Sequence, residues 1–273
     1  MKKPLIIMSA PNGARRQKSD HSAIPITPDD MADCAESIVE NGASILHLHV
    51  RDEKNAHSLD VDRYRASISA IKNRVGDQLI IQATTEAVGI YDRYQQMDMV
   101  KILKPEAVSI ALRELCPNDE ALSEFSAFTK WMAGENIFPQ YILYDETDYQ
   151  RFESYRKQGI FQDDMPFTLF VLGSYLGPTP EADVMAEQMK LRTIKAEFPW
   201  AVCGFATNEA DCISHAAHNR GHIRVGFENN IWRDADHLLD NNSEMIKYSA
   251  TEAEKARRPV ANSDDVRKIF RLE

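Results

Sequence analysis

Two histidines that could bind a metal ion lie close together in a short apolar segment. His47 and His49 alternate with aliphatic residues over positions 45–50, a pattern typical of a β-strand. Side chains at i and i+2 of a strand share one face, so the two imidazoles point the same way, about 6–7 Å apart along the backbone. Such a pair can bind one metal ion only if a third ligand comes from elsewhere in the chain.

A carboxylate that could complete the site follows a later predicted strand, over residues 222–227. Arg224, Gly226 and Glu228 share parity there and should all face inward, with Gly226 leaving free volume just below the carboxylate. Two histidines, one carboxylate and an open position form the ligand set of a catalytic zinc site. Other divalent ions accept the same ligands. Taken singly, a strand histidine is more often a core residue, and Glu228 alone would more often lie at a helix N-terminus.

The elements that must position these residues alternate between strands and helices. Alternation of this kind implies parallel pairing, and about eight units in 273 residues predict a single-domain α/β (β/α)8 barrel with a C-terminal helical extension. The alternative is an open doubly wound sheet, but no GxGxxG or GxxxxGK[ST] loop follows the first strand. Strands are predicted at 5–8, 45–50, 79–84, 107–111, 140–144, 167–173, 200–203 and 222–227. Helices are predicted near 27–41, 60–72, 91–103, 121–134, 145–158, 181–196, 204–218 and from 243 onward.

Barrel closure explains how distant residues could meet. Strand eight lies beside strand one, one strand away from the histidine strand, and neighbouring strands are about 4.8 Å apart. Catalytic groups of this fold lie at the carboxyl ends of the strands. Glu228 is therefore expected to reach a metal bound by His47 and His49.

Composition excludes several classes of protein. The net charge of −10 and the pI of about 5.3 argue against a general binder of nucleic acid or anionic membranes. The four cysteines form no CxxC pair, so neither a disulfide framework nor a thiolate zinc site is expected. The N-terminal apolar run is too short for a signal peptide, and no run approaches the roughly 18 residues that span a bilayer. A cytoplasmic location is expected.

Two other folds use a His-x-His pair. His47, His49 and Glu53 match the metal spacing of a cupin, but a cupin needs many short antiparallel strands, whereas helical patterns flank this segment. Amidohydrolase barrels carry the pair on the first strand with further strand-end histidines, and this chain has it on the second.

Four motifs, at residues 47–52, 103–106, 170–173 and 221–230, together resemble the β-keto acid cleavage enzymes, a family that includes 3-keto-5-aminohexanoate cleavage enzyme. The resemblance covers nearly the whole chain, from residues 10–13 to the final helix. It implies a zinc-dependent (β/α)8 barrel, an acyltransferase that condenses a β-keto acid with acetyl-CoA and releases acetoacetate and a new acyl-CoA. It also implies a homo-oligomer, often a tetramer.

The resemblance assigns roles to individual residues. It supports His47, His49 and Glu228 as metal ligands. Thr84 and Ser109 match hydroxyl positions that bind the substrate carboxylate, Arg224 matches the arginine of the catalytic machinery, and Asn12 and Arg15 lie on the first loop, which contributes to substrate binding.

This chain departs from the family pattern at four positions. Arg15 replaces an acidic residue, Ile142 replaces a glutamate, and Ala111 replaces a polar residue. Asn229 replaces the aspartate that works as a base with the arginine, and an amide cannot accept the proton. Possible replacement carboxylates at strand ends are Glu86, Glu114, Asp145 and Glu146.

The arginine at position 15 bears on the substrate. Arg15 and Arg16 disfavour a cationic substrate end and favour an anionic or polar one. The alternative is that both are solvated loop charges. Two other functions stay open: a zinc lyase or hydrolase that cleaves a β-dicarbonyl compound without CoA, and a non-catalytic barrel that binds a metal and a carboxylate ligand.

Overall fold

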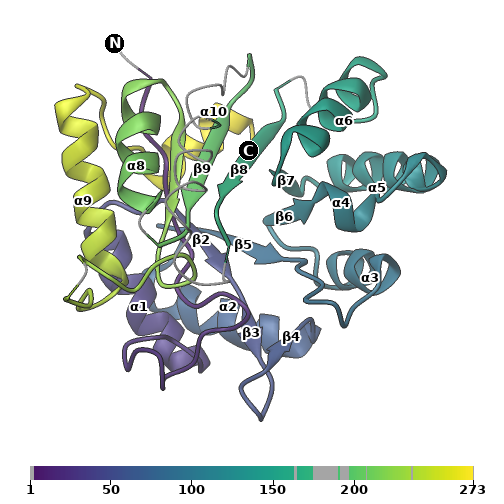
Figure 1. The fold of residues 1–273 in the computed structure, drawn as a ribbon. Coiled ribbons are helices and arrows are strands. Elements are labelled where there is room, and N and C mark those ends of the chain that lie inside the picture. The colour runs from purple at the N-terminus through teal and green to yellow at the C-terminus, as the bar shows by residue number, and fades with distance from the viewer. Residues whose placement is uncertain are drawn as a thin grey trace.

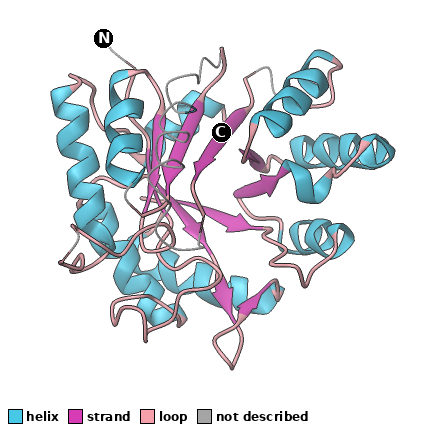
Figure 2. Cartoon of the chain, viewed as in Figure 1, coloured by secondary structure: helices cyan, strands magenta, loops and turns pink. Residues whose placement is uncertain are grey.

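The computed structural model describes residues 3–162, 165–174, 190, 197–206, 208–234 and 236–272, and the strands among them form a closed parallel barrel (Figures 1 and 2). The order around the barrel is β1-β10-β9-β8-β7-β6-β5-β2, and every pair is parallel. This confirms the predicted (β/α)8 fold. The barrel strands are β1 (Ile7–Ser9), β2 (Ile45–Leu48), β5 (Ile80–Thr84), β6 (Ala107–Ala111), β7 (Phe138–Leu143), β8 (Phe167–Leu172), β9 (Trp200–Gly204) and β10 (His222–Val225).

Helices surround the barrel (Figure 2), and their buried apolar side chains form a common core with those of the strands. The first of them begins where the sequence predicts: Thr27 accepts a hydrogen bond from Asp30 N, Asp30 accepts one from Thr27 N, and Pro28 occupies the first turn. Of the predicted helix at 181–196, only residue 190 is among the described residues. The helices are α1 (Pro28–Glu40), α2 (Val61–Val75), α3 (Arg93–Leu103), α4 (Leu112–Leu115), η1 (Asp119–Ala121), α5 (Leu122–Gly134), α6 (Glu146–Lys157), α8 (Asn208–His218), α9 (Asn242–Lys255) and α10 (Ser263–Phe270).

Strand β1 lies between β2, which contains His47, and β10, which precedes Glu228. Met8 is aligned with Arg224 of β10 on one side and with Ile45 of β2 on the other. The segments that follow β2 and β10 therefore emerge at the same rim of the barrel, one strand apart. This is the neighbourhood that the sequence predicts for the metal site.

The histidine strand is shorter than expected and leads into a hairpin that the sequence analysis missed. Strand β2 ends at Leu48, and β3 (Val50–Arg51) pairs antiparallel with β4 (His57–Ser58). The turn between them is closed by Asp52 Oδ1, which accepts hydrogen bonds from the amides of Lys54 and Ala56 at 2.8 Å. Figure 1 shows the hairpin beyond the barrel strands. It carries His57 back toward the barrel rim.

The opposite end of the barrel is closed by α10. The Phe270 ring lies 4.4 Å from that of Phe138 and 4.9 Å from that of Phe167, the first residues of β7 and β8. This apolar plug leaves the carboxyl ends of the strands as the open end. No helix in the described part of the chain is long and apolar enough to cross a membrane.

Candidate metal centre and adjoining cavity

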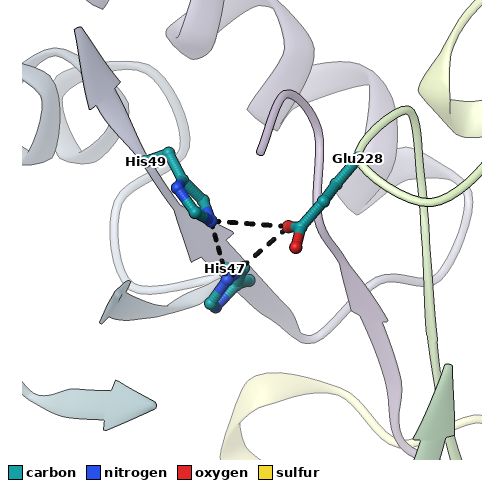
Figure 3. A group of neighbouring side chains, drawn as sticks. All are labelled: His47, His49 and Glu228. Carbon is teal, nitrogen blue, oxygen red and sulfur yellow. Dashed lines mark hydrogen bonds and ion pairs between the residues drawn. The ribbon is translucent and has the colours of Figure 1, made fainter. Parts of the chain in front are cut away.

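Three buried donor atoms converge at the carboxyl end of β2. His47 Nε2 and His49 Nε2 lie 3.1 Å apart, and Glu228 Oε2 lies 3.6 Å and 3.5 Å from them (Figure 3). All three side chains are almost fully buried. His49 lies just beyond the end of β2, and it still faces the same way as His47. The structure thus brings together the three residues that the sequence predicts as metal ligands.

The tautomer of His47 is set by a chain of amides. Its Nδ1 lies 2.9 Å from Gln82 Oε1, an acceptor, so Nδ1 donates and the lone pair of Nε2 faces Glu228. Gln82 is oriented in turn, because its Nε2 donates to Gln140 Oε1 at 3.2 Å. Gln140 Nε2 then donates to the sulfur of Met8 at 3.4 Å. The sequence analysis overlooked Gln82, although it shares strand parity with Thr84.

His49 is backed by another imidazole. Its Nδ1 lies 3.4 Å from Nδ1 of His57, whose Nε2 lies 2.9 Å from the backbone oxygen of Glu86. Burial lowers the pKa of His57 to about 3 and that of His47 to about 3, so both rings are neutral at physiological pH. His57 thus belongs to a buried polar network that links His49 to the backbone at Glu86.

Glu228 lies in a turn after β10, and three elements hold that turn. Glu228 N donates to Ala10 O at 3.0 Å, and Phe227 N donates to Asn242 Oδ1 at 2.8 Å. The free volume expected beside Gly226 is absent: a Cβ there would lie 2.4 Å from Ala10 O. Gly226 also has a φ of +137°, which favours glycine. The prediction of free volume was wrong, because the backbone of Ala10, directly after β1, occupies the space.

The third support of the turn is a buried carboxyl on α8. Glu209 accepts hydrogen bonds from Gly226 N at 3.3 Å and from Asn230 Nδ2 at 3.0 Å, so it holds both ends of the segment that contains Glu228. Burial raises the pKa of Glu209 to about 8. Sequence patterning gave no signal for this residue, since it lies on a helix and contacts the turn only in the folded chain.

Arg224 places a positive charge beside the carboxylate. Its Nη2 donates to Glu228 Oε1 at 3.2 Å and contacts Cys203 Sγ at 3.4 Å. Burial acts to raise the pKa of Glu228, but the positive charge of Arg224 outweighs it and holds the pKa below the usual range. Glu228 is therefore ionised and fit to bind a cation.

The donor set fits a divalent metal ion. The amides behind His47 and the His57 imidazole behind His49 each place the ligand's hydrogen on Nδ1, which leaves Nε2 of both ligands unprotonated. No proton therefore lies between these two Nε2 atoms. Glu228 Oε2 is buried and accepts no hydrogen bond from the residues that the structure describes. Three electron-pair donors this close repel one another unless a cation lies between them. Two imidazoles and one carboxylate suit zinc, and other divalent ions accept them too.

A cavity of about 300 Å³ opens beside these residues. His47, Arg224 and Glu228 line it, together with Thr84 and Ser109, which are aligned on neighbouring strands. Ser109 Oγ is buried and has no hydrogen-bond partner in the described part of the chain. Thr84 Oγ1 accepts a hydrogen bond from Glu86 N at 3.1 Å. The two hydroxyls predicted to bind a carboxylate therefore face the same space as the metal ligands.

Two of the three glutamates proposed as replacement bases, Glu86 and Glu114, line this cavity, and Glu146 does not. Glu86 Oε2 lies 3.9 Å from His49 Nδ1, and burial raises the pKa of its carboxyl. Glu114 accepts a hydrogen bond from Ala87 N at 3.1 Å, and burial raises its pKa to about 7. Asp145 does not line the cavity, because it caps α6 and pairs with Arg113 at 2.6 Å.

Apolar side chains also line the cavity, namely Ile142, Ala111, Val171 and Phe205. Two of the four departures from the family pattern, Ile142 and Ala111, therefore lie at the cavity. Arg15 lies at the same cavity, and its charge acts to lower the pKa of Glu86.

Arg51 holds the backbone of the first loop through hydrogen bonds. Arg51 Nη2 donates to Gly13 O at 2.6 Å and to Arg16 O at 2.8 Å, on either side of Arg15. Asn12 is buried and does not line the cavity, and its Nδ2 donates to the backbone oxygen of His49 at 3.2 Å. This hydrogen bond fixes the backbone of the metal ligand His49. The contact between Asn12 and the substrate stays a prediction.

Asn229 and Glu53 do not line the cavity. The Asn229 side chain is buried, and neither its oxygen nor its nitrogen has a hydrogen-bond partner among the described residues. Glu53 lies on the exposed hairpin turn and pairs with Arg63, so the metal spacing typical of a cupin has no counterpart in the fold.

Comparison with known proteins identifies the family. The sequence model of the beta-keto acid cleavage enzyme family matches residues 4–272. The chain belongs to this family. This confirms the resemblance and the prediction of an acyltransferase enzyme.

Two relatives match over nearly their whole length. A 3-keto-5-aminohexanoate cleavage enzyme from Fusobacterium nucleatum is 30% identical, and the match covers 100% of this chain and 99% of the relative. A 3-oxoadipate:acetyl-CoA acetyltransferase from Cupriavidus necator is 24% identical, with 100% and 96% covered. Among solved structures, apo ObcA superposes with a TM-score of 0.72 at 15% identity, over 91% of this chain and 65% of that longer chain. The last comparison supports the barrel fold alone.

Proposed function

We propose that this protein is a zinc-dependent enzyme that condenses a β-keto acid with acetyl-CoA and releases acetoacetate and a new acyl-CoA. The observation that carries the proposal is the convergence of His47, His49 and Glu228 at a cavity that also presents the Thr84 and Ser109 hydroxyls. The names of the two relatives, one of which acts with acetyl-CoA, support the same reaction class.

The reaction exchanges one acyl group for another. A carbon–carbon bond forms between the α carbon of the keto acid and the acetyl carbonyl, and the CoA thiolate leaves. The thiolate then attacks the original keto carbon, the bond from this carbon to the α carbon breaks, and acetoacetate departs. Both halves develop negative charge on the keto-acid oxygens, and bound zinc would supply Lewis-acid stabilisation of that charge.

The chain's own residues supply binding and orientation. In the proposal, the hydroxyls of Thr84 and Ser109 donate hydrogen bonds to the substrate carboxylate, which gives Ser109 Oγ the partner that it lacks within the described chain. Arg224 keeps Glu228 ionised and adds a fixed positive charge beside the reacting carbons. The apolar lining of the cavity, which includes Ile142, packs against the side chain of the keto acid and excludes water from it.

We assign the proton transfer to Glu86, with Glu114 as the second candidate. Glu86 lines the cavity, its oxygen lies 3.9 Å from His49 Nδ1, and it is a carboxylate, whereas Asn229 is an amide outside the cavity lining. Glu114 holds the backbone at Ala87, directly after Glu86. Glu86→Gln is expected to lower kcat at least 100-fold while zinc still binds. Glu114→Gln should have a smaller effect on kcat.

The substrate end that faces Arg15 is proposed to be anionic or polar. Arg15 lines the cavity near Glu86, and Ile142 offers no charge to an ammonium group. The relatives' names indicate that this family handles both an amino-substituted acid and a diacid. Arg15→Glu is expected to shift the ratio of kcat/KM toward an amino-substituted β-keto acid.

The deciding experiment is a mass-spectrometric screen of the zinc-loaded protein. β-Keto acids with anionic, neutral and cationic ends are incubated with and without acetyl-CoA, and acetoacetate and the new acyl-CoA are measured. Product that requires acetyl-CoA and is absent in His49→Ala supports the proposal. Cleavage without acetyl-CoA would indicate a lyase or hydrolase. If the zinc-loaded protein forms no product from any of the β-keto acids, the proposed acyl transfer is refuted. The expected homo-oligomer stays a prediction.

A further inference from the structure

His57 occupies a position that neither the metal ligand set nor the proposed reaction uses. It lies on the β3–β4 hairpin, eight residues after His49, and it is buried, with 7% of the residue exposed and its ring 5.2 Å from that of His49. Each of its two nitrogens faces a different functional part of the site. Nδ1 faces His49 at 3.4 Å, and Nε2 faces the backbone oxygen of Glu86 at 2.9 Å.

The backbone oxygen of Glu86 determines which ring nitrogens of His57 and His49 carry hydrogen. A backbone oxygen only accepts hydrogen bonds, so Nε2 of His57 must carry hydrogen. A neutral imidazole carries one hydrogen, so Nδ1 of His57 is an acceptor, and Nδ1 of His49 must donate to it. The lone pair of His49 is then on Nε2, the nitrogen 3.5 Å from Glu228 Oε2.

The opposite arrangement would break a contact. If Nε2 of His49 carried the hydrogen, Nδ1 of His49 would be an acceptor and Nδ1 of His57 would have to donate. Nε2 of His57 would then present a lone pair to Glu86 O at 2.9 Å, which is repulsive. The metal-binding tautomer of His49 and the position of the Glu86 backbone therefore support each other.

We propose that His57 is a positioning residue that holds His49 in its metal-binding tautomer and ties this ligand to the Glu86 segment. The proposal rests on the proposed metal site but not on the identity of the substrate. Hydrogen-bond partners behind metal-bound histidines typically affect metal affinity 10–100-fold. Here the same partner also anchors the segment that follows β5, so zinc binding should make that segment more rigid.

The first test compares two variants at this position. His57→Ala removes both contacts and should weaken zinc binding roughly 10–100-fold, measured by competition with a chromophoric chelator. It should also speed hydrogen exchange of residues 85–91 in the zinc-loaded protein. His57→Asn retains an acceptor near His49 Nδ1 but cannot reach Glu86 O. It should therefore recover most of the zinc affinity and still show the faster exchange.

His222 provides the matched control. It is as buried as His57, at 7%, and burial lowers its pKa to about 3 as well. Its Nδ1 accepts a hydrogen bond from Ile6 N at 3.0 Å, away from the metal ligands. His222→Ala should leave zinc affinity and the exchange of residues 85–91 unchanged, even where it lowers overall stability.

A spectroscopic test needs no variant. In zinc-loaded protein labelled with ¹⁵N-histidine, His49 should carry hydrogen on Nδ1 and His57 on Nε2. Hydrogen on Nδ1 of His57 would overturn the proposal, as would wild-type zinc affinity and wild-type exchange in His57→Ala. If the wild-type protein binds no zinc, the metal site itself is refuted and this role of His57 fails with it.

Discussion

Gly226→Ala tests how the metal carboxylate is held, because position 226 combines backbone strain with a close contact. A φ of +137° costs a non-glycine residue on the order of 1–3 kcal/mol. The new Cβ would lie 2.4 Å from Ala10 O, whereas ordinary contacts begin at 3.4 Å, so β1 and the turn must separate by about 1 Å. That movement also breaks the hydrogen bond from Glu228 N to Ala10 O, worth about 1 kcal/mol.

The expected loss in free energy of unfolding is about 3–5 kcal/mol, measured by urea unfolding of the metal-free protein. Gly76→Ala is the control, since Gly76 has a φ of +62° and an added Cβ meets nothing within 4 Å. Its φ of 62° and ψ of −134° also favour glycine, so this variant should lose about 1–3 kcal/mol from backbone strain alone. Because Glu228 moves with the turn, zinc affinity should fall at least 10-fold in Gly226→Ala and stay unchanged in Gly76→Ala. Equal losses in the two variants, with zinc affinity retained in both, would refute the reasoning.

Three further predictions concern the same site. Gln82→Leu removes the acceptor for His47 Nδ1, so zinc affinity should fall roughly 10–100-fold in chelator competition, and an unchanged affinity would contradict the amide chain. Zinc at 100 times its Kd should add about 2.7 kcal/mol of stability in calorimetry, and none in His49→Ala; equal stabilisation of both would place the ion elsewhere. Burial raises the pKa of Glu209 from 4.5 to about 8, so the folded protein binds more protons than the unfolded chain between these values and loses stability as pH rises through them. Glu209→Gln should lack this loss in urea unfolding at several pH values, and parallel profiles for variant and wild type would argue against it.

The metal ligands could be predicted because their placement depends on two simple regularities. Alternation along a strand puts His47 and His49 on one face, and closure of a barrel puts the last strand next to the first. Gln82 was within reach of the same reasoning, since it lies two residues before Thr84 on β5 and therefore faces the same side.

Other parts of the site depend on contacts that no local pattern encodes. His57 reaches His49 only because the β3–β4 turn folds back, and Glu209 reaches Gly226 only through the packing of α8. Gly226 shows the limit most clearly. Its lack of a side chain suggested empty space, whereas in the fold it admits the backbone of Ala10.

The position of β1 between β2 and β10 has a consequence for how the chain folds. The histidines lie early in the sequence and Glu228 lies near its end, so the three ligands cannot meet until β1 and β10 have paired. Pairing between such distant segments is slow compared with local helix formation. High-affinity zinc binding should therefore develop only in the last step of refolding, after most helical signal has returned. A zinc-sensitive dye followed alongside circular dichroism would then time the closure of the barrel directly.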